Sequence, residues 1–145
     1  RGLDVNHLTT RYFLPEPRIS LGQYLRGKVN AVADISDGLV ADLGHICETS
    51  GVGADIQIID IPLSKAARSA LAKKPDLLDM ILSGGDDFEL LFTTEQNFAE
   101  TANDLTDKSG VALTKIGEIK QSRTIRLIDR AGNEYTLHQK GYTHF

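Results

Sequence analysis

The sequence is short of the residues and patterns that several common classes of site require. It holds one cysteine in 145 residues, which excludes both a disulfide framework and a cysteine-rich zinc site. Lysine and arginine are scattered singly and the formal net charge is −4, so the basic stripe needed to bind a nucleic-acid backbone is missing. No apolar run approaches the roughly 20 residues that cross a bilayer, and the first residues lack a signal-peptide pattern. These absences favour a cytoplasmic protein with neither a nucleic-acid nor a membrane partner.

The composition is otherwise that of an ordinary globular domain. Hydrophobic residues make up 41% of the sequence and charged residues 25%, which suffices for one core. We find no internal repeat, low-complexity segment or linker, so residues 1–145 are expected to form a single domain. The sequence begins with Arg1 rather than methionine, which hints that it was cut from a longer protein. Cys47 lies in an apolar helical pattern, and we interpret it as a core residue rather than a reactive thiol.

Helical and strand patterns alternate along most of the sequence. Short apolar, β-branched runs indicate strands, and apolar residues at helical spacing indicate helices that end at glycines. Two closing strands joined by the turn "RAGN" indicate a hairpin. We therefore predict an α+β domain in which a mixed β-sheet is layered with α-helices. The predicted helices cover residues 21–27, 39–47, 64–74 and 94–110, with a short one after Pro75, and the predicted strands cover 29–35, 54–60, 88–93, 111–119, 124–129 and 134–139.

The stretch "AVADISDGLVADL" carries the first candidate site. Asp34 falls at the carboxyl end of a predicted strand and Asp37 at the mouth of the next helix, where sheets with parallel strands generally bind ligands. A turn at Ser36 and Gly38 would bring both carboxylates toward one cation, and Mg²⁺ suits such a pair best. An alternative needs no ligand: Asp37 or Ser36 caps the helix, and Asp34 accepts backbone hydrogen bonds in the turn.

Two later stretches add candidate residues. In "LSGGDDFELLFT", paired glycines would let the backbone approach a ligand closely while Asp86 and Asp87 face it, although the same letters also suit a solvated turn. The terminal "KGYTHF" is unusually aromatic for a tail. Either it packs into the core, or Tyr142 offers a flat face to a ring.

Together these stretches resemble the carboxyl-terminal domain of thiamine-monophosphate kinase. The matching motifs occur in the family's order: "DISDGL", "SGVGADI", "IPLS", "SGGDDFELLFT" and "GYTHF". The resemblance runs from Pro15 to Phe145 and implies the fold of the aminoimidazole ribonucleotide synthetase C-terminal domain. "DISDG" alone would indicate only the wider superfamily, which includes selenophosphate synthetase. The last two motifs single out the thiamine enzyme.

The resemblance implies transfer of a phosphoryl group from ATP to thiamine monophosphate, with Mg²⁺, to give thiamine diphosphate. Carried over by position, Asp34 and Asp37 would be magnesium ligands and Ser36 a contact to ATP. Asp86 would touch the thiamine phosphate and Tyr142 would pack against it. The family often has Glu where this sequence has Asp86, which leaves the form of that contact open but not its chemical type.

The chemistry itself requires no catalytic side chain. Phosphoryl transfer depends on positioning and charge neutralisation, and the acceptor phosphate, with a second pKa of about 6, is already largely ionised near neutral pH. We therefore expect that His45, His138 and His144 are not general bases, and that several Mg²⁺ ions bring the two polyanions together.

Two aspartates cannot hold several ions, and the sequence contains no phosphate-binding P-loop. In the family the remaining ligands lie on an amino-terminal domain, absent here, which also makes most of the homodimer contact. The chain is thus expected to be an inactive half-site with an apolar patch left uncovered.

Two other functions remain open from the sequence. One is another ATP-dependent superfamily member that acts on selenide or a ribonucleotide amide. The other is a non-catalytic ligand-binding domain. The presence of Asp34, Asp37, Asp86 and Tyr142 together argues against the second, because buried or clustered carboxylates are costly to keep without chemistry.

Overall fold

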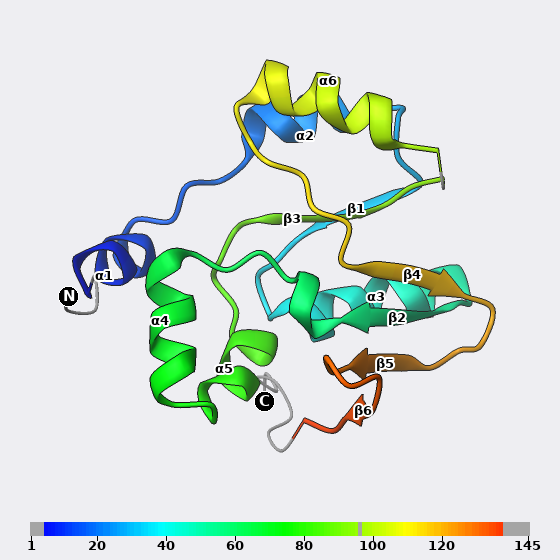
Figure 1. Cartoon of the computed structure of the whole chain (residues 1–145). Coiled ribbons are helices and arrows are strands. Elements are labelled where there is room, and N and C mark those ends of the chain that lie inside the picture. The colour runs from blue at the N-terminus through cyan, green and yellow to red at the C-terminus, as the bar shows by residue number, and fades with distance from the viewer. Residues whose placement is uncertain (1–4, 96, 138–145) are drawn as a thin grey trace.

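The computed structural model describes residues 5–95 and 97–137, which fold into helices and two β-sheets (Figure 1). The predicted α+β class is confirmed, although most strands are shorter than predicted and the first helix was not predicted. The elements are α1 (Val5–Phe13), α2 (Ile19–Leu25), β1 (Ala31–Asp34), α3 (Leu39–Ser50), β2 (Gly53–Gln57), the 3₁₀ turn η1 (Ile58–Asp60), α4 (Lys65–Lys73), α5 (Leu77–Ser83), β3 (Leu90–Thr93), α6 (Ala99–Ser109), β4 (Gly117–Lys120), β5 (Ile125–Ile128) and β6 (Glu134–Tyr135).

The larger sheet is mixed, as predicted. Its strand order is β4-β2-β5-β6, with β2 parallel to β5 and the two outer pairs antiparallel. The predicted hairpin joins β5 to β6, and its turn is closed by the Asp129 carboxylate, which accepts hydrogen bonds of 2.8 Å from the amides of Ala131 and Asn133. Gly132 adopts a φ of 86° there, a conformation that glycine reaches without steric cost.

The strands β1 and β3 form a separate antiparallel pair, which corrects the prediction of one sheet. Ala31 lies opposite Thr93 and Asp34 opposite Leu90. Asp34 does end its strand, as predicted, but the analogy to sheets with parallel strands does not apply to β1, because a short apolar run does not encode the direction of its partner. Antiparallel pairing has a different consequence. The turn that follows β1 and the loop that precedes β3 lie at the same end of the ladder.

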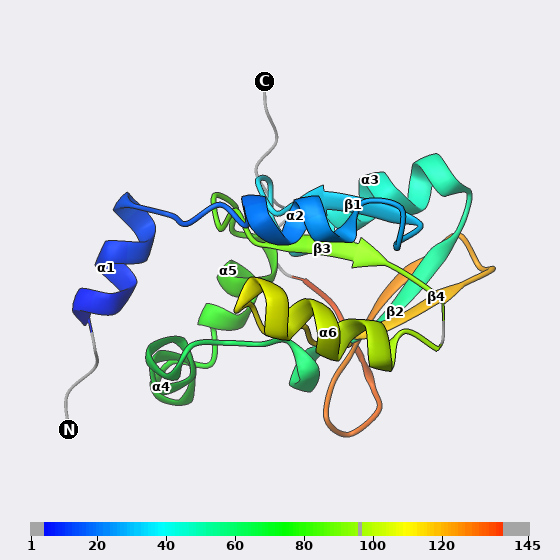
Figure 2. The ribbon, with the colours of Figure 1, turned by 90° about the horizontal axis from the view of Figure 1, so that it is seen from above.

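Two hydrophobic cores lie on the two faces of this ladder. Figures 1 and 2 show α2 and α6 on one side of β1 and β3, and Figure 1 shows α3 on the other side. In β3, Leu91 belongs to the core under α3, whereas Leu90 and Phe92 pack against the core between α2 and α6. This alternation follows from the two-residue period of a strand. The ladder is thus held from both faces.

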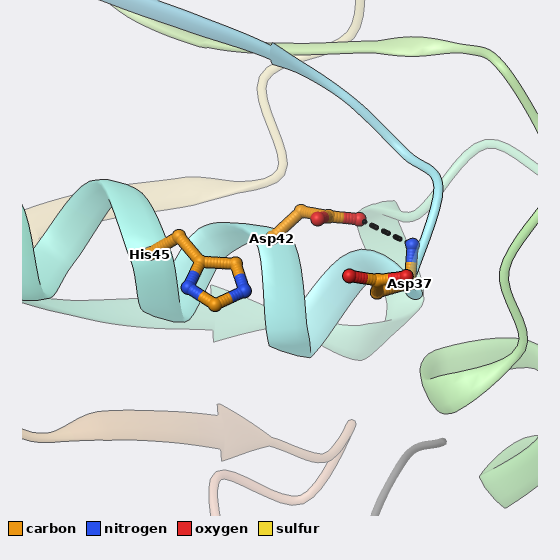
Figure 3. Close-up of side chains that lie close together, drawn as sticks. All are labelled: Asp37, Asp42 and His45. Carbon is orange, nitrogen blue, oxygen red and sulfur yellow. Dashed lines mark hydrogen bonds between the residues drawn. The ribbon is translucent and has the colours of Figure 1, made fainter. Parts of the chain in front are cut away.

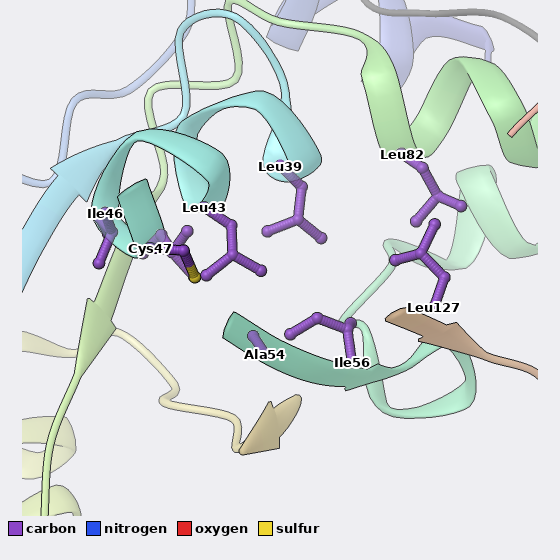
Figure 4. Packing of buried hydrophobic residues seen from close by; sticks show 9 residues of the cluster. Leu39, Leu43, Ile46, Cys47, Ala54, Ile56, Leu82 and Leu127 are labelled. Atoms are coloured by element: carbon purple, nitrogen blue, oxygen red, sulfur yellow. The ribbon is translucent and has the colours of Figure 1, made fainter. Parts of the chain in front are cut away.

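The core under α3 joins α3 and α5 to strands from both sheets (Figure 4). Cys47 is 3% exposed within it, so its predicted role as a core residue is confirmed. The buried members are Leu39, Leu43, Ile46, Cys47, Ala54, Ile56, Leu82, Leu91 and Leu127.

The predicted helix ends are largely confirmed. Ser64 caps α4, and its hydroxyl accepts a hydrogen bond of 3.1 Å from the amide of Ala67. Gly51 and Gly110 end α3 and α6 in the left-handed conformation. Within residues 5–95 and 97–137, we find no helix long and apolar enough to span a lipid bilayer.

Candidate functional site

The two acidic motifs, distant in sequence, lie against each other in the structure. The turn at residues 35–38 follows β1, and the loop at residues 84–89 precedes β3. The Asp86 amide donates a hydrogen bond of 2.9 Å to the carbonyl oxygen of Ser36, and the Phe88 amide donates one of 3.1 Å to that of Ile35. The Ile35 amide in turn donates one of 2.9 Å to the Glu89 carbonyl. Backbone hydrogen bonds therefore join the candidate metal and nucleotide turn to the candidate substrate loop.

Glycines permit this close contact between the two backbones. A Cβ atom on Gly85 would collide with the carbonyl oxygen of Ser36, and one on Gly38 would lie 2.6 Å from that of Ser83. The sequence predicted that the paired glycines would admit a ligand. In the structure, Gly85 faces the carbonyl oxygen of Ser36, whereas Gly84 faces that of Met80 in the preceding helix.

The loop that carries Asp86 is conformationally unusual. Asp86 has a φ of 63° and Phe88 a φ of 53°, and these are the two residues other than glycine with positive φ among those described. Aspartate tolerates the left-handed region because its short side chain bonds locally, but a bulky residue such as Phe does so rarely. Strain of this kind persists where the surroundings over-determine the backbone, and it concentrates at functional sites.

The predicted site residues occupy different environments around the joined motifs. Asp34 and Asp86 are exposed, whereas Ser36 and Asp37 are half-buried. Tyr142 lies outside the described residues, as do His138 and His144. The backbone hydrogen bond between Asp86 and Ser36 brings the candidate substrate contact next to the candidate nucleotide contact.

The structure groups Asp37 with two residues that sequence reasoning did not select, Asp42 and His45 (Figure 3). One potential ligand atom from each of the three lies within 4.8 Å of the others. Asp34, the predicted second metal ligand, is not a member of this group. Carboxylate oxygens are the donors that Mg²⁺ prefers, so the residues around the turn are compatible with such an ion.

The side chain that organises the turn before α3 is Asp42, which lies inside the helix. The residue before α3 is Gly38, so neither Asp37 nor Ser36 holds the N-cap position considered for it. Instead Asp42 Oδ2 accepts hydrogen bonds of 3.0 Å from the Ser36 amide and 3.1 Å from the Asp37 amide.

A signal for Asp42 was present in the sequence. It lies three residues after Leu39 and four before Ile46, on the apolar face of α3, and it is 5% exposed. A carboxylate on a core face requires hydrogen-bonding partners, because an unpaired buried charge is strongly disfavoured.

Electrostatics around the loop are dominated by carboxylates. Partial desolvation of the Asp87 carboxyl, with the charges of Glu89 and Asp86, raises the pKa of Asp87. Glu89 is neutralised by Arg18, whose Nε and Nη2 donate to the two carboxylate oxygens at 2.9 and 2.6 Å. Hydrogen bonding to Glu89 raises the pKa of Arg18 in return. Such a surface favours a ligand that arrives with cations.

A hollow on the described surface lies away from these motifs. It has a volume of about 650 Å³ and is lined by residues 27–30, before β1, and by residues after β3 that include Phe98 and Thr101. Because β1 and β3 are antiparallel, these segments flank the opposite end of the ladder from the joined motifs. This hollow is therefore separate from the candidate site.

Comparison with known proteins shows where these features belong. The family described as AIR synthase related protein, C-terminal domain, matches residues 8–130. The chain belongs to this family. Within it, the chain is similar to the thiamine-monophosphate kinase of Escherichia coli (strain K12), with 38% identity over 142 residues. That match covers 98% of the chain and 43% of the relative, so the chain spans less than half the length of this curated protein.

Solved structures extend this AIR synthase-related assignment to the fold. The crystal structure of thiamine-monophosphate kinase from Stenotrophomonas maltophilia K279a matches with a TM-score of 0.78 and 38% identity, over 83% of this chain and 38% of that one. AaThiL complexed with AMPPCP and TMP matches with a TM-score of 0.75 and 28% identity, over 100% of this chain and 43% of that one. The resemblance inferred from the motifs is thus confirmed.

Proposed function

We propose that this chain is the carboxyl-terminal domain of an ATP-dependent kinase that phosphorylates thiamine monophosphate to thiamine diphosphate. The observation that carries the proposal is the junction of the Ser36 turn and the Asp86 loop, in a fold similar along its whole length to AaThiL complexed with AMPPCP and TMP. The junction would hold the two candidate ligand contacts beside each other. Phosphoryl transfer requires that proximity, because its catalysis is mostly positioning and charge neutralisation.

The proposed roles of the residues follow the motifs. Asp34 and Asp37 would hold Mg²⁺, and Ser36 would contact ATP. Bound Mg²⁺ would neutralise phosphate charge and orient the two substrates. The grouping of Asp37 with two further potential ligands supports a cation at this turn. His45 is exposed and belongs to that group, which suits a place near the cation better than a role as a general base.

Asp86 and Tyr142 would bind thiamine monophosphate. Asp86 is exposed and held by its backbone against Ser36, so its carboxylate belongs to the surface beside the proposed nucleotide contact. A carboxylate does not bind a phosphate directly without a cation between them, because the two charges repel. We therefore expect Asp86 to act through a bound Mg²⁺ or through the cationic part of the substrate.

The whole enzyme is proposed to be a cytoplasmic homodimer that completes this half-site with an amino-terminal ATP- and Mg²⁺-binding domain. Four large apolar side chains near α1 and α2 support an uncovered contact face. Tyr12 is 76% exposed, and Phe13, Leu14 and Ile19 are each 70% exposed. The chain alone is therefore expected to be inactive, and thiamine diphosphate formation by it would contradict this.

The test is isothermal titration of thiamine monophosphate into the whole protein with Mg²⁺ and a non-hydrolysable ATP analogue. We expect binding that weakens about tenfold or more in both variants, because Asp86→Asn removes the proposed carboxylate charge and Tyr142→Ala removes the proposed packing contact. Asp107→Asn, an exposed acid on α6, is the matched charge control and should bind normally. Absence of binding to the unaltered protein would move the function to another branch of the superfamily.

A further inference from the structure

We infer that Asp42 is the positioning residue of the site, holding the Ser36–Asp37 turn in its ligand-binding conformation without being a ligand itself. This inference rests on the proposed function, because it concerns the turn to which we assign the metal and nucleotide contacts. None of the sequence motifs that indicated the family assigns a role to Asp42. Its contacts are what distinguish it from the exposed acids nearby.

The geometry is the reverse of an ordinary helix cap. A side chain inside α3 accepts hydrogen bonds from two backbone amides that precede the helix. Side chains on a helix lean toward its amino terminus, so the Asp42 carboxylate, in the first turns of α3, points back to the residues before the helix. There, a single oxygen, Oδ2, accepts hydrogen bonds from the Ser36 amide at 3.0 Å and the Asp37 amide at 3.1 Å. Both donors are thereby aimed inward, away from the surface that would receive the ligands.

Burial makes these two hydrogen bonds strong determinants of the turn. Asp42 is 5% exposed, and the same helix supplies Leu39 and Leu43 to the core under α3. In such surroundings a carboxylate needs its donors, and charge-assisted hydrogen bonds are roughly twice as strong as neutral ones. The negative charge near the amino terminus of α3 is also favoured by the helix dipole.

The effect of Asp42 reaches the second motif through the backbone. Ser36 donates its amide to Asp42 and accepts a hydrogen bond from the Asp86 amide on its carbonyl. The peptide units on both sides of the Ser36 side chain are therefore fixed, one by the helix and the other by the loop. Loss of Asp42 should loosen the proposed nucleotide contact and the proposed substrate contact together.

The competing role for Asp42 is direct ligation of a cation with Asp37 and His45, whose potential ligand atoms lie within 4.8 Å of its own. Figure 3 shows Asp42 turned toward the Asp37 amide, with the His45 ring one turn along the same helix. The two roles differ in their response to asparagine. Its side-chain oxygen still accepts both amide hydrogen bonds, but a neutral amide is a much poorer ligand for Mg²⁺ than a carboxylate.

The experiment compares Asp42→Ala and Asp42→Asn with two controls. Leu43→Ala, at a core residue that is 2% exposed, reproduces general destabilisation of α3, and Glu48→Gln removes an exposed charge from the same helix. Amide hydrogen exchange is measured by NMR in the 145-residue chain. In the whole protein, KM for Mg·ATP is measured beside kcat and the unfolding midpoint.

We expect Asp42→Ala to lower the exchange protection of the Ser36 and Asp37 amides about 100-fold, lower that of Asp86 less, and raise KM for Mg·ATP about tenfold. Asp42→Asn should recover most of both losses. Leu43→Ala should lower the unfolding midpoint without the KM change, and Glu48→Gln should change neither quantity.

The inference is overturned if Asp42→Ala leaves the Ser36 and Asp37 amides protected, or if Asp42→Asn is as impaired as alanine. The second result would make Asp42 a cation ligand. If the alanine variant does not fold, the asparagine variant decides alone. Loss of protection at the Ser36 and Asp37 amides in that variant also overturns the inference. If the whole protein does not phosphorylate thiamine monophosphate, the proposed function fails, while the exchange pattern still decides the role of Asp42.

Discussion

Gly85 has no side chain, and its contact with Ser36 depends on that absence. The same holds for Gly38, which faces the carbonyl oxygen of Ser83 from the other motif. Each glycine therefore lets one acidic segment approach the backbone of the other. At the scale of single residues, the site is built as much by these missing side chains as by its carboxylates.

Substitution at Gly85 tests that contact. We expect Gly85→Ala to lower the free energy of unfolding by about 3 kcal/mol, the upper range for overpacking, because the new methyl group meets backbone that cannot rotate away. Gly110→Ala is the control: Gly110 has a φ of 69° but open space around it, so only conformational strain of about 1 kcal/mol applies. Urea unfolding of both variants measures the difference. Equal losses would mean that the loops separate easily.

Residue types at the site were predictable from the sequence, but their grouping was not. Two aspartates around a glycine turn predicted a cation-binding turn, and Asp37 does lie in a group of potential ligands. The partner was predicted to be Asp34, three residues before it. The structure instead groups Asp37 with Asp42 and His45. Side chains in the first turns of a helix lean toward its amino terminus, which brings Asp42 and His45 near the turn before α3.

Among the elements, the segment before α2 acts as a strap on the loop at residues 84–89. Arg18 holds Glu89 through two hydrogen bonds and also lies 3.4 Å from Glu16, while Glu89 directly precedes β3. The geometry is that of a fork-shaped guanidinium on a carboxylate, which a lysine cannot reproduce. The strap connects the core between α2 and α6 to the loop that carries Asp86.

We therefore expect Arg18→Lys to behave more like Arg18→Ala than like the unaltered protein. Both should lower the free energy of unfolding by about 1 kcal/mol, a value discounted because the Glu89 side chain is 44% exposed. A double-mutant cycle with Glu89→Ala, in low and high salt, measures the pair. A coupling energy near zero at low salt would show that the strap does not hold the loop.

Helix boundaries were predictable because their signals are local, such as Ser64 at the start of α4 and Gly110 at the end of α6. Strand pairing was not, because partners are chosen by packing between distant segments. The predicted strand at residues 111–119 begins only at Gly117, where pairing with β2 begins. The helix α1 was not predicted, although Leu8 and Tyr12 in it lie at helical spacing, because the segment is short and most of its other residues are polar.

At the scale of the whole molecule, surface ion pairs contribute to the response to acid. Hydrogen bonds from Lys120 and Lys115 lower the pKa of Glu118 from its ordinary 4.5 to about 2. Arg126 lowers the pKa of Asp55, and Lys108 that of Asp104, in the same direction. Asp87 has the opposite effect on the acid response, because desolvation raises its pKa.

We expect the free energy of unfolding to fall as the pH is lowered from about 4.5 to about 2. The sign follows because the unfolded chain takes up the Glu118 proton first, so protonation favours unfolding until the folded state is also protonated. Urea unfolding at several pH values measures the slope, and high salt should flatten it. Glu118→Gln should remove part of the slope and Glu48→Gln less. A slope unchanged in Glu118→Gln would contradict this account.

The buried thiol described in the core under α3 makes the chain convenient to label. Cys47 is the one cysteine of the sequence, it is 3% exposed, and desolvation raises its pKa, so little reactive thiolate is available to a maleimide reagent. A second cysteine introduced at an exposed position such as Glu48 or Asp107 would react far faster under native conditions. A fluorophore or spin label can therefore be attached at a chosen point without first removing the native cysteine, and the distance from that point to a label on a bound partner becomes measurable.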